Sequence, residues 1–239
     1  MSFPKRMTYR EGLAIAMRRA LAEHDNTVII GQGVTDHKGI FGTVSNLGKE
    51  FGAHRLIETP LSEEAITGIC IGAALNGLYP INTHIRADFA LLAMNQLVNL
   101  AAKYAYMFGG RFRVPMLVRL VIGRSWGQGA QHSQSLQSLF AHIPGLTVIM
   151  PSTPEAVVDS YNYAITNHRG PVISLEHRLM YELEFDTAAH PRESHPFASR
   201  LEREGRHVTI VATSVMVLEA RRAARHLAQH GVDCEIIDL

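Results

Sequence analysis

The chain has 239 residues, of which 46% are hydrophobic and 19% charged, as expected for a globular protein of one large domain or slightly more. Its formal net charge of +1 gives no electrostatic basis for binding nucleic acid or an anionic membrane. The apolar runs are interrupted within about ten residues, which is too short for a membrane span, and the first residues do not resemble a secretory signal.

The two cysteines, Cys70 and Cys234, lie far apart in the chain and form no CxxC motif. We therefore expect neither a disulfide scaffold nor a zinc site, and we expect a reducing, cytoplasmic location. Histidines are plentiful, but no HExxH motif or paired Cys/His spacing occurs, so a dedicated metal centre is not expected.

Helical and strand-like patterns alternate along the chain. Residues 8–24 carry apolar side chains at helical spacing, and Thr8 with Glu11 forms a capping-box pattern. A second helix is expected over 62–78 with Ser62 as its N-cap, and a third is expected to open at Ser152 with an S-x-x-E pattern. The remaining expected elements are strands at 27–31, 56–57, 79–85, 114–123, 146–150 and 171–176, and a long helix at 89–108.

Residues 180–206 are polar and rich in Pro, His, Glu and Arg, which indicates a connecting segment. We place the linker itself at 191–206, after a first domain at 1–190. A strand, a helix and a strand follow at 207–239. A single βαβ unit is too small to bury a core of its own, so this piece is expected to be the start of a second α/β domain.

Repeated strand–helix–strand units with apolar strands predict a doubly wound, mostly parallel α/β sheet with helices on both faces. Ligands bind such sheets at the carboxyl ends of their strands. The loops after residues 31, 58, 85 and 123 are therefore the candidate site loops.

Three side chains near these loops are candidates for chemistry. Glu63 begins a helix, where a carboxylate interacts favourably with the helix dipole but also stands ready to exchange a proton. Phe89 follows Asp88 at a helix start and would be either a core residue or a ring that stacks on a planar ligand. His132 lies in a polar loop and is either solvated or placed for proton transfer.

The helix at 62–78 also contains several glycines, including Gly68 and Gly72. Each glycine inside a helix costs about 0.5–1 kcal/mol relative to alanine. This cost suggests close backbone approach, either to a helix of the same chain or across an interface, and the residues alone do not separate the two.

The ordered set of segments resembles the β subunit of thiamine-diphosphate-dependent 2-oxo acid dehydrogenases, the E1 component of pyruvate, branched-chain and acetoin dehydrogenase complexes, within the transketolase-like superfamily. The resemblance covers about residues 8–181 and is carried by ETPLSE (58–63), GxxxGAALNGLYP (68–80), DFALLAMNQLVNLAAKYAYMFGG (88–110), AQHSQSLQSLFAHIPGL (130–146), PSTPEA (151–156) and PVISLEHRLMY (171–181). It implies that residues 1–190 are a pyrimidine-binding domain and that 207–239 begin a transketolase C-terminal-like domain.

The resemblance also implies the roles of individual residues. Glu63 matches the glutamate that hydrogen-bonds N1′ of the cofactor's aminopyrimidine, which helps the 4′-amino group take the proton from C2 of the thiazolium. Phe89 matches the aromatic that packs on the pyrimidine, and Ile85 belongs to the same cofactor-binding set. His132 matches the histidine of the HSQ motif, which faces the reactive end of the cofactor and the substrate.

In the family, the diphosphate and Mg²⁺ are held by an α-type E1 subunit through a GDG…N motif that this sequence lacks. The implied assembly is a heterotetramer of α-type chains and two copies of this one, with lipoyl E2 as acyl acceptor. This makes an interface the favoured explanation for the glycines of helix 62–78. The chain would then be inactive alone.

Several features leave the substrate open. Thr83 and Asn95 stand at positions that are often acidic in the family, and LVIGRSWGQG (120–129) differs from its usual RGPxG-type loop. The chain also stops after the first βαβ unit of the second domain. The alternatives are a split transketolase that transfers a two-carbon ketol unit, for which Arg86, His84 and Arg124 would supply basic groups, and a truncated, non-catalytic paralogue.

Overall fold

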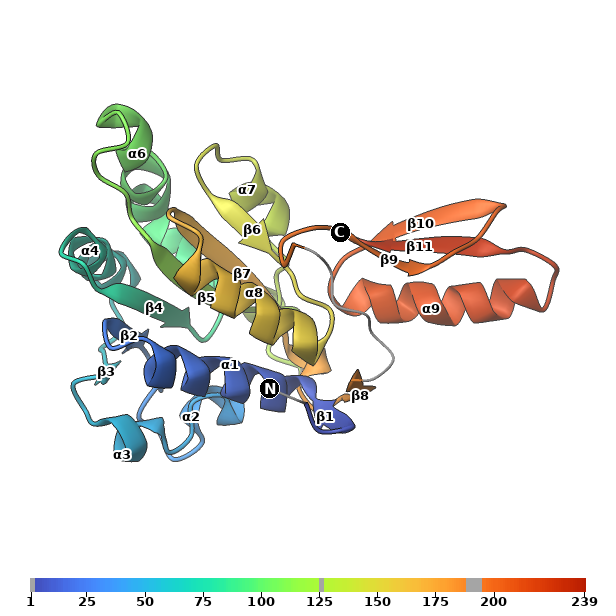
Figure 1. Cartoon of the computed structure of the whole chain (residues 1–239), viewed down its shortest axis with the longest axis horizontal. Coiled ribbons are helices and arrows are strands. Elements are labelled where there is room, and N and C mark those ends of the chain that lie inside the picture. The colour runs from blue at the N-terminus through green and yellow to red at the C-terminus, as the bar shows by residue number, and fades with distance from the viewer. Residues whose placement is uncertain (1–2, 125–126, 188–194) are drawn as a thin grey trace.

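The computed structural model describes residues 3–124, 127–187 and 195–239. Its centre is a six-stranded sheet in which every pair of neighbouring strands is parallel. In spatial order the strands are β3 (Leu56–Glu58), β2 (Thr27–Gly31), β4 (Tyr79–His84), β5 (Met116–Ile122), β7 (Pro171–His177) and β6 (Thr147–Ile149). Helices cover both faces of this sheet (Figure 1), which confirms the predicted doubly wound α/β class.

Alternation along the buried strands sends side chains into two separate cores. On one face, α1 (Tyr9–Glu23) and α8 (Pro154–Thr166) pack over residues such as Ile81 and Leu117. On the other face, α4 (Glu63–Leu75) and α5 (Ala87–Ala90) pack over their strand neighbours. The shorter helical turns are α2 (Gly39–Gly42), α3 (Leu47–Phe51), α7 (Gln137–Ala141), η3 (Ala130–His132) and η4 (Arg178–Met180).

The predicted capping box at the start of α1 is confirmed. The backbone N–H of Glu11 donates to Thr8 Oγ1 at 3.2 Å, and the N–H of Thr8 donates to Glu11 Oε2 at 2.6 Å. The S-x-x-E start at Ser152 is wrong, because Thr153 is the N-cap of α8 and accepts from the N–H of Ala156. The hydroxyl of Ser152 is instead bonded to Asp238 in the C-terminal unit.

The long helix expected at 89–108 is divided. After α5, residues Leu91–Ala93 form a 3₁₀ turn (η1), Asn95–Ala101 a π-helical segment (η2), and Tyr104–Met107 the short helix α6. The N–H of Ala102 bonds the carbonyl of Leu97, five residues back, which is the widened pattern of a π-helix. The apolar spacing predicted helical backbone correctly, but it does not separate these hydrogen-bond patterns.

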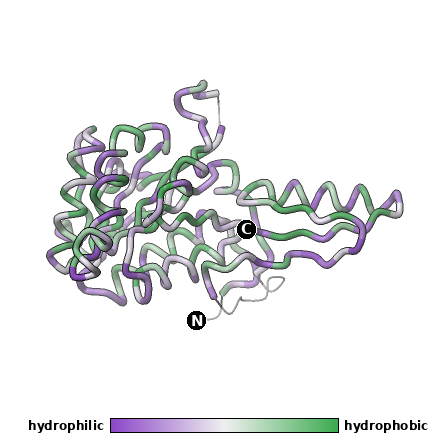
Figure 2. The backbone as a smooth tube through the Cα atoms, turned by 90° about the horizontal axis from the view of Figure 1, so that it is seen from above, coloured by the Kyte–Doolittle hydropathy of each residue, from purple (hydrophilic) through white to green (hydrophobic). Residues whose placement is uncertain are grey.

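The C-terminal residues form a small unit beside the main sheet, visible as an extension in Figure 2. It consists of the sheet β10 (Val208–Ala212), β11 (Cys234–Asp238) and β9 (Arg200–Arg203), with α9 (Val215–Ala228) packed on it. Strand β9 lies within the expected linker 191–206 and pairs antiparallel with β11. Residues 191–194 lie outside the described residues, and the domain limits stay a prediction.

A second small sheet ties the ends of the first unit together. Strand β1 (Arg6–Thr8) pairs antiparallel with β8 (Glu184–Asp186), which lies in the polar stretch that starts at residue 180. No helix in the described part of the chain is long and apolar enough to cross a membrane.

Candidate active site

Glu63 is the first residue of α4 and lies at the carboxyl edge of the sheet. The side chain is almost fully buried, with 9% of its surface exposed. Gln32, in the loop after β2, donates from Nε2 to Glu63 Oε1 at 3.3 Å. The expected N-cap Ser62 precedes Glu63 but makes no side-chain capping bond. Two of the predicted loops, after β2 and after β3, therefore meet at this carboxylate.

Glu58, at the end of β3, holds the loop that carries Gln32. Its carboxylate accepts from the N–H of Gly33 at 2.6 Å, and from the N–H and hydroxyl of Thr35 at 2.9 and 3.0 Å. Gly33 has φ +68°, a conformation that side chains rarely adopt. The glycine and the carboxylate together fix the path of the loop toward Glu63.

The structure brings Phe89 and His132 together. Their ring centroids are 5.1 Å apart, with an edge-to-face angle of 76°. Phe89 is 37% exposed, so the expectation that it is a core residue is wrong. His132 is half-buried in η3. The ring pair presents an aromatic surface next to a titratable nitrogen.

Hydrogen bonds from Asp88 fix the loop that carries His132. Asp88 Oδ1 accepts from the backbone N–H of Gln134 at 3.2 Å and from its side-chain amide at 2.9 Å. The carbonyl of Gln134 in turn accepts from the N–H of Gly123, at the end of β5. Sequence reasoning named neither Asp88 nor Gln134 as a site residue, although Asp88 precedes Phe89 and Gln134 lies two residues after His132.

Ile85 follows β4 at the same edge. A Cβ built on Gly33 would lie 3.5 Å from Ile85 Cδ1, so this side chain lies against the loop that also carries Gln32. Ile85 is partly exposed. The four predicted site residues therefore come from the segments that follow β3, β4 and β5 at the carboxyl edge of the sheet.

A buried polar group lies next to Glu63 on the α4 face of β4. Asn82 Nδ2 donates to Thr67 Oγ1 at 3.0 Å and lies 3.1 Å from His84 Nε2. Burial lowers the pKa of His84 to about 4, and the carboxylate of Glu63 opposes that effect. His84 is therefore an uncharged imidazole at neutral pH and does not add to the positive charge of the site.

Basic side chains gather where β4, β5 and β7 end. Arg86 is buried and donates from Nη1 to the carbonyl of Gly123 at 3.1 Å. Burial lowers the pKa of Arg86, and the charge of Arg178 adds to this effect. The pKa of His177 is lowered by burial and then by Arg124 and Arg86. Because these charges shift one another's pKa values, Arg86, Arg124, His177 and Arg178 lie in one region of the structure.

A buried ion pair anchors β5 to β7 below this edge. Arg119 Nε and Nη2 bond the two oxygens of Glu176 at 2.7 and 2.9 Å, and both side chains are at most 1% exposed. Tyr161 and Tyr181 donate to the same carboxylate at 2.5 and 2.6 Å. Both oxygens of Glu176 are thus bonded, which offsets part of the cost of burying its charge, whereas the buried Arg119 Nη1 has no hydrogen-bond partner in the described structure.

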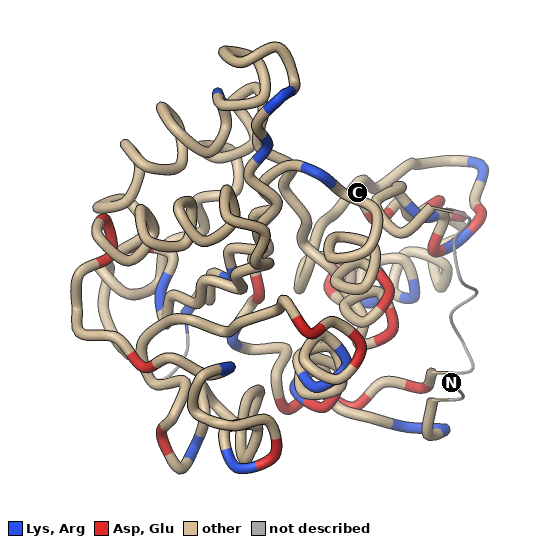
Figure 3. Tube along the Cα trace, turned by 60° about the vertical axis from the view of Figure 1, so that its left-hand side comes forward, with Lys and Arg blue, Asp and Glu red and all other residues tan. Residues whose placement is uncertain are grey.

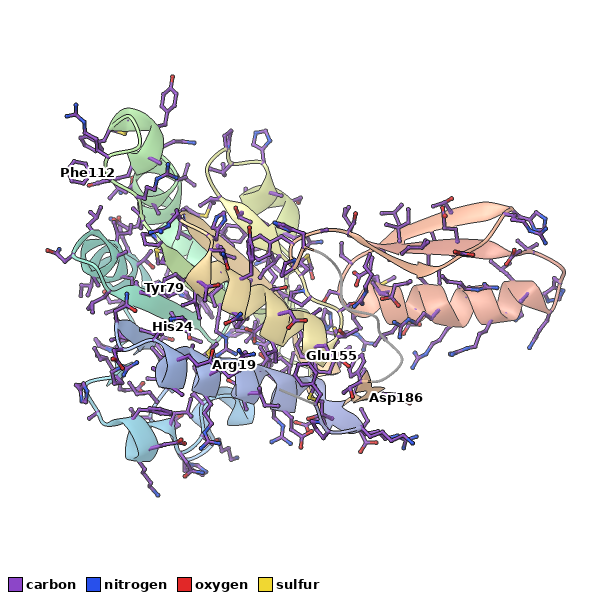
Figure 4. All side chains as sticks on the ribbon, viewed as in Figure 1. Arg19, His24, Tyr79, Phe112, Glu155 and Asp186 are labelled. Atoms are coloured by element: carbon purple, nitrogen blue, oxygen red, sulfur yellow. The ribbon has the colours of Figure 1, made fainter. Side chains whose placement is uncertain are left out.

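A cavity of about 280 Å³ lies elsewhere, between α8 and the C-terminal unit. Glu155 lines it from α8, and Figure 4 labels this side chain at α8. Its residues come from the opposite sheet edge to Glu63 and include Arg200 and Asp238. The chemistry suggested by Glu63 and His132 therefore lies at the carboxyl edge near α4 and η3 and not in this cavity.

Residues 5–184 match the family model described as the transketolase pyrimidine-binding domain, and residues 198–239 match the transketolase C-terminal domain. The chain is 37% identical to the pyruvate dehydrogenase E1 component β subunit of Rickettsia conorii, over 98% of this chain and 71% of that protein. It belongs to the pyruvate dehydrogenase E1 β-subunit family. This confirms the family resemblance found in the sequence.

Other E1 β-family members give similar values. The mitochondrial β subunit of Ascaris suum and the β subunit of Rhizobium meliloti are each 35% identical, and the matches cover 98% of this chain and 65% and 51% of those proteins. The chain thus spans about half to two thirds of the length of these two relatives.

Solved structures agree with the E1 β-family fold. A split-gene transketolase, described as an inactive β4 tetramer, superposes with a TM-score of 0.78 at 21% identity, over 98% of this chain and 71% of that one. A transketolase variant from Pichia stipitis, complexed with fructose 6-phosphate, gives 0.74 at 17% identity, over 99% and 35%. At these identities the likeness concerns the fold alone.

Proposed function

We propose that this chain is the β-type subunit of a thiamine-diphosphate-dependent 2-oxo acid dehydrogenase, in which Glu63 activates the aminopyrimidine of the cofactor. The observation that carries the proposal is the buried carboxylate of Glu63 at the carboxyl edge of the sheet, in an E1 β-family chain. A buried carboxylate with a single side-chain donor at 3.3 Å keeps acceptor capacity for a ligand.

The residues present fit one end of thiamine diphosphate. Glu63 would bond the pyrimidine ring nitrogen N1′, and the partly exposed Phe89 ring would pack on the pyrimidine, next to Ile85. His132 would face the reactive end and hold or move a proton there. When bound, the cofactor supplies the carbanion stabilisation that decarboxylation requires.

We propose that the diphosphate and Mg²⁺ are held by an α-type partner. In the described part of the chain, no group of three or more His, Cys, Asp or Glu side chains is placed to hold a metal ion. The proposed assembly is a heterotetramer with a second copy of this chain, and lipoyl E2 is the proposed acyl acceptor.

The surface around α4 supports burial against a partner. Beyond Glu64 the helix carries no charged residue, and none occurs at 89–102 either; Figure 3 shows these long uncoloured helical stretches on one side of the molecule. Ile69 and Leu92 are 57% and 61% exposed, and a Cβ on Gly72 would meet nothing within 4 Å. Large exposed apolar patches of this kind mark interaction surfaces.

We propose that the protein is located in a reducing compartment such as the cytoplasm. Both cysteines, Cys70 and Cys234, are buried free thiols. Burial raises the pKa of the Cys70 thiol to about 12, which keeps it protonated and unreactive.

A split transketolase is the second candidate, favoured by the basic groups Arg86, Arg124, His177 and Arg178 at the sheet edge. Such a cluster would suit a phosphorylated ketose. His84, which we expected to contribute, is uncharged at neutral pH and faces Glu63, so it gives this candidate no support.

The test compares Glu63→Gln with Glu64→Gln. Glu64 is its exposed neighbour on α4 and accepts two long hydrogen bonds, from Asn95 Nδ2 at 3.4 Å and from Gln96 Nε2 at 3.5 Å. Each variant is mixed with the α-type partner, thiamine diphosphate and Mg²⁺, and assayed for 2-oxo acid decarboxylation and for assembly. We expect Glu63→Gln to lose turnover by a factor of at least about 100, because general acid–base catalysis contributes 10²–10⁴-fold, while Glu64→Gln keeps it.

Full turnover by Glu63→Gln would overturn the role of this residue. Turnover of a ketose phosphate, with no turnover of any 2-oxo acid, would favour the split transketolase. Failure of the wild-type chain to bind cofactor in the presence of the α-type partner would favour the non-catalytic paralogue.

A further inference from the structure

A polar ladder joins β4 to α4 within an otherwise apolar layer. Its members are Thr67 on the helix and Asn82 and His84 on the strand, and each has at most 4% of its surface exposed. The neighbouring side chains of this layer, such as Ile66 and Cys70, belong to the hydrophobic core. Polar groups are costly to bury unless they bond one another or serve a ligand site.

The register of strand and helix places His84 opposite Glu63. Strand β4 runs toward the carboxyl edge, and α4 begins at that edge and runs back over the strand. Asn82 and His84 are separated by two strand residues, about 6.6 Å, and Thr67 and Glu63 by four helical residues, about 6 Å. Because Asn82 bonds Thr67, His84 reaches the level of Glu63.

The electrostatics of His84 agree with this placement. The carboxylate of Glu63 acts on the imidazole and raises its pKa, but burial has the larger effect and lowers it to about 4. On β5 the residue paired with His84 is Leu120, and on β4 its polar contact is the neutral Asn82. The imidazole next to Glu63 is therefore polar and carries no charge at neutral pH.

We propose that His84 is a positioning residue for Glu63: its imidazole lies at the level of the carboxyl group and gives it a buried polar neighbour where a ring nitrogen of the cofactor would bind. The inference rests on the function proposed for Glu63. A cation at position 84 would hold Glu63 as a carboxylate, and an apolar residue would favour its neutral form. Either change would disturb the sharing of a proton between Glu63 and the ring nitrogen, which is most effective when the two groups have similar proton affinities.

The test follows the titration of the Glu63 carboxyl carbon by ¹³C NMR in the full chain without cofactor, with the signal assigned from Glu63→Gln. In His84→Lys we expect the Glu63 curve to move to lower pH by about 1–3 units, as for an opposite charge within a few ångströms. In His84→Leu we expect it to move to higher pH. His84→Gln, polar and neutral, should leave it closest to the wild type.

A matched control is His168→Leu. His168 is also partly buried and lies 3.1 Å from a threonine hydroxyl, that of Thr147, at the far end of the sheet from Glu63. This variant should lower the melting temperature without moving the Glu63 curve. If His84→Lys does not fold, His84→Leu decides the question, and an unmoved Glu63 curve in a folded His84→Leu overturns the inference.

The outcome is separable from the function proposed above. If Glu63 responds to position 84 but Glu63→Gln retains full turnover with the α-type partner, the coupling stands and the proposed function fails. If Glu63→Gln is inactive but the Glu63 titration ignores position 84, the proposed function stands and the inference about His84 fails.

Discussion

Gln134 donates both its backbone N–H and its side-chain amide to a single oxygen of Asp88, at 3.2 and 2.9 Å. This pair fastens the loop of His132 to the helix start that carries Phe89, and the two rings meet 5.1 Å apart as a result. The site therefore depends on a contact between segments more than forty residues apart.

Asp88→Ala should release this loop. We expect the free energy of unfolding to fall by about 1–3 kcal/mol, because two charge-assisted hydrogen bonds in a partly buried setting are lost. Amide hydrogen exchange at Gln134 should become faster. Asp36→Ala, which removes an exposed acid in the loop after β2, is the control and should change neither quantity. Unchanged exchange at Gln134 in Asp88→Ala would contradict the fastening role.

Arg119→Met should leave the carboxylate of Glu176 buried without its cationic partner. We expect a loss of about 3–5 kcal/mol in denaturant unfolding. Adding Glu176→Gln removes the stranded charge but keeps an acceptor for the hydroxyls of Tyr161 and Tyr181. The double variant should be more stable than Arg119→Met alone, and equal stability of the two would show that the charge is not what matters.

His84 should make the chain sensitive to acid. Its pKa is about 4 in the folded state and 6.5 in the reference state, so the unfolded chain binds the proton first. The contribution of neutral His84 to the free energy of unfolding is complete above pH 6.5. It is lost as the pH falls toward 4, by about 3 kcal/mol in total. His84→Gln has no histidine to titrate at this position. Between pH 7 and 4, the free energy of unfolding should therefore fall by more in the wild type than in His84→Gln. Parallel curves would exclude it.

Gly72→Ala should stabilise the isolated chain by about 0.5–1 kcal/mol, because the helix gains an alanine and the new methyl group meets nothing within 4 Å. If α4 is buried against a partner, the same change should weaken assembly with the α-type chain or with the second copy. Analytical ultracentrifugation measures the assembly, and thermal unfolding measures the stability.

Gly12→Ala provides the opposite case. A Cβ on Gly12 would lie 2.5 Å from Pro154 Cβ, where α1 crosses the start of α8. We expect this overpacking to cost about 1–3 kcal/mol in the isolated chain. Similar effects of the two substitutions would mean that the space around Gly72 is not open.

Local patterns predicted the elements that depend on neighbours in sequence. The capping box at Thr8, the buried strands and the helix that starts at Glu63 all follow from side-chain periodicity and from groups three or four residues apart. The same alternation of strands and helices placed the site loops at one edge, because parallel strands end together. Family resemblance added the roles of Glu63, Phe89 and His132, which remain proposals.

The pairing of distant segments was decided only by the tertiary structure. Ser152 fits a capping pattern, but its hydroxyl bonds Asp238, 86 residues away, and Thr153 caps the helix instead. His84 is one of many histidines in the sequence, and only the packing of α4 on β4 sets it beside Glu63 and leaves it uncharged. Periodicity fixes which face a side chain takes, whereas its partner and its protonation depend on what the fold places opposite it.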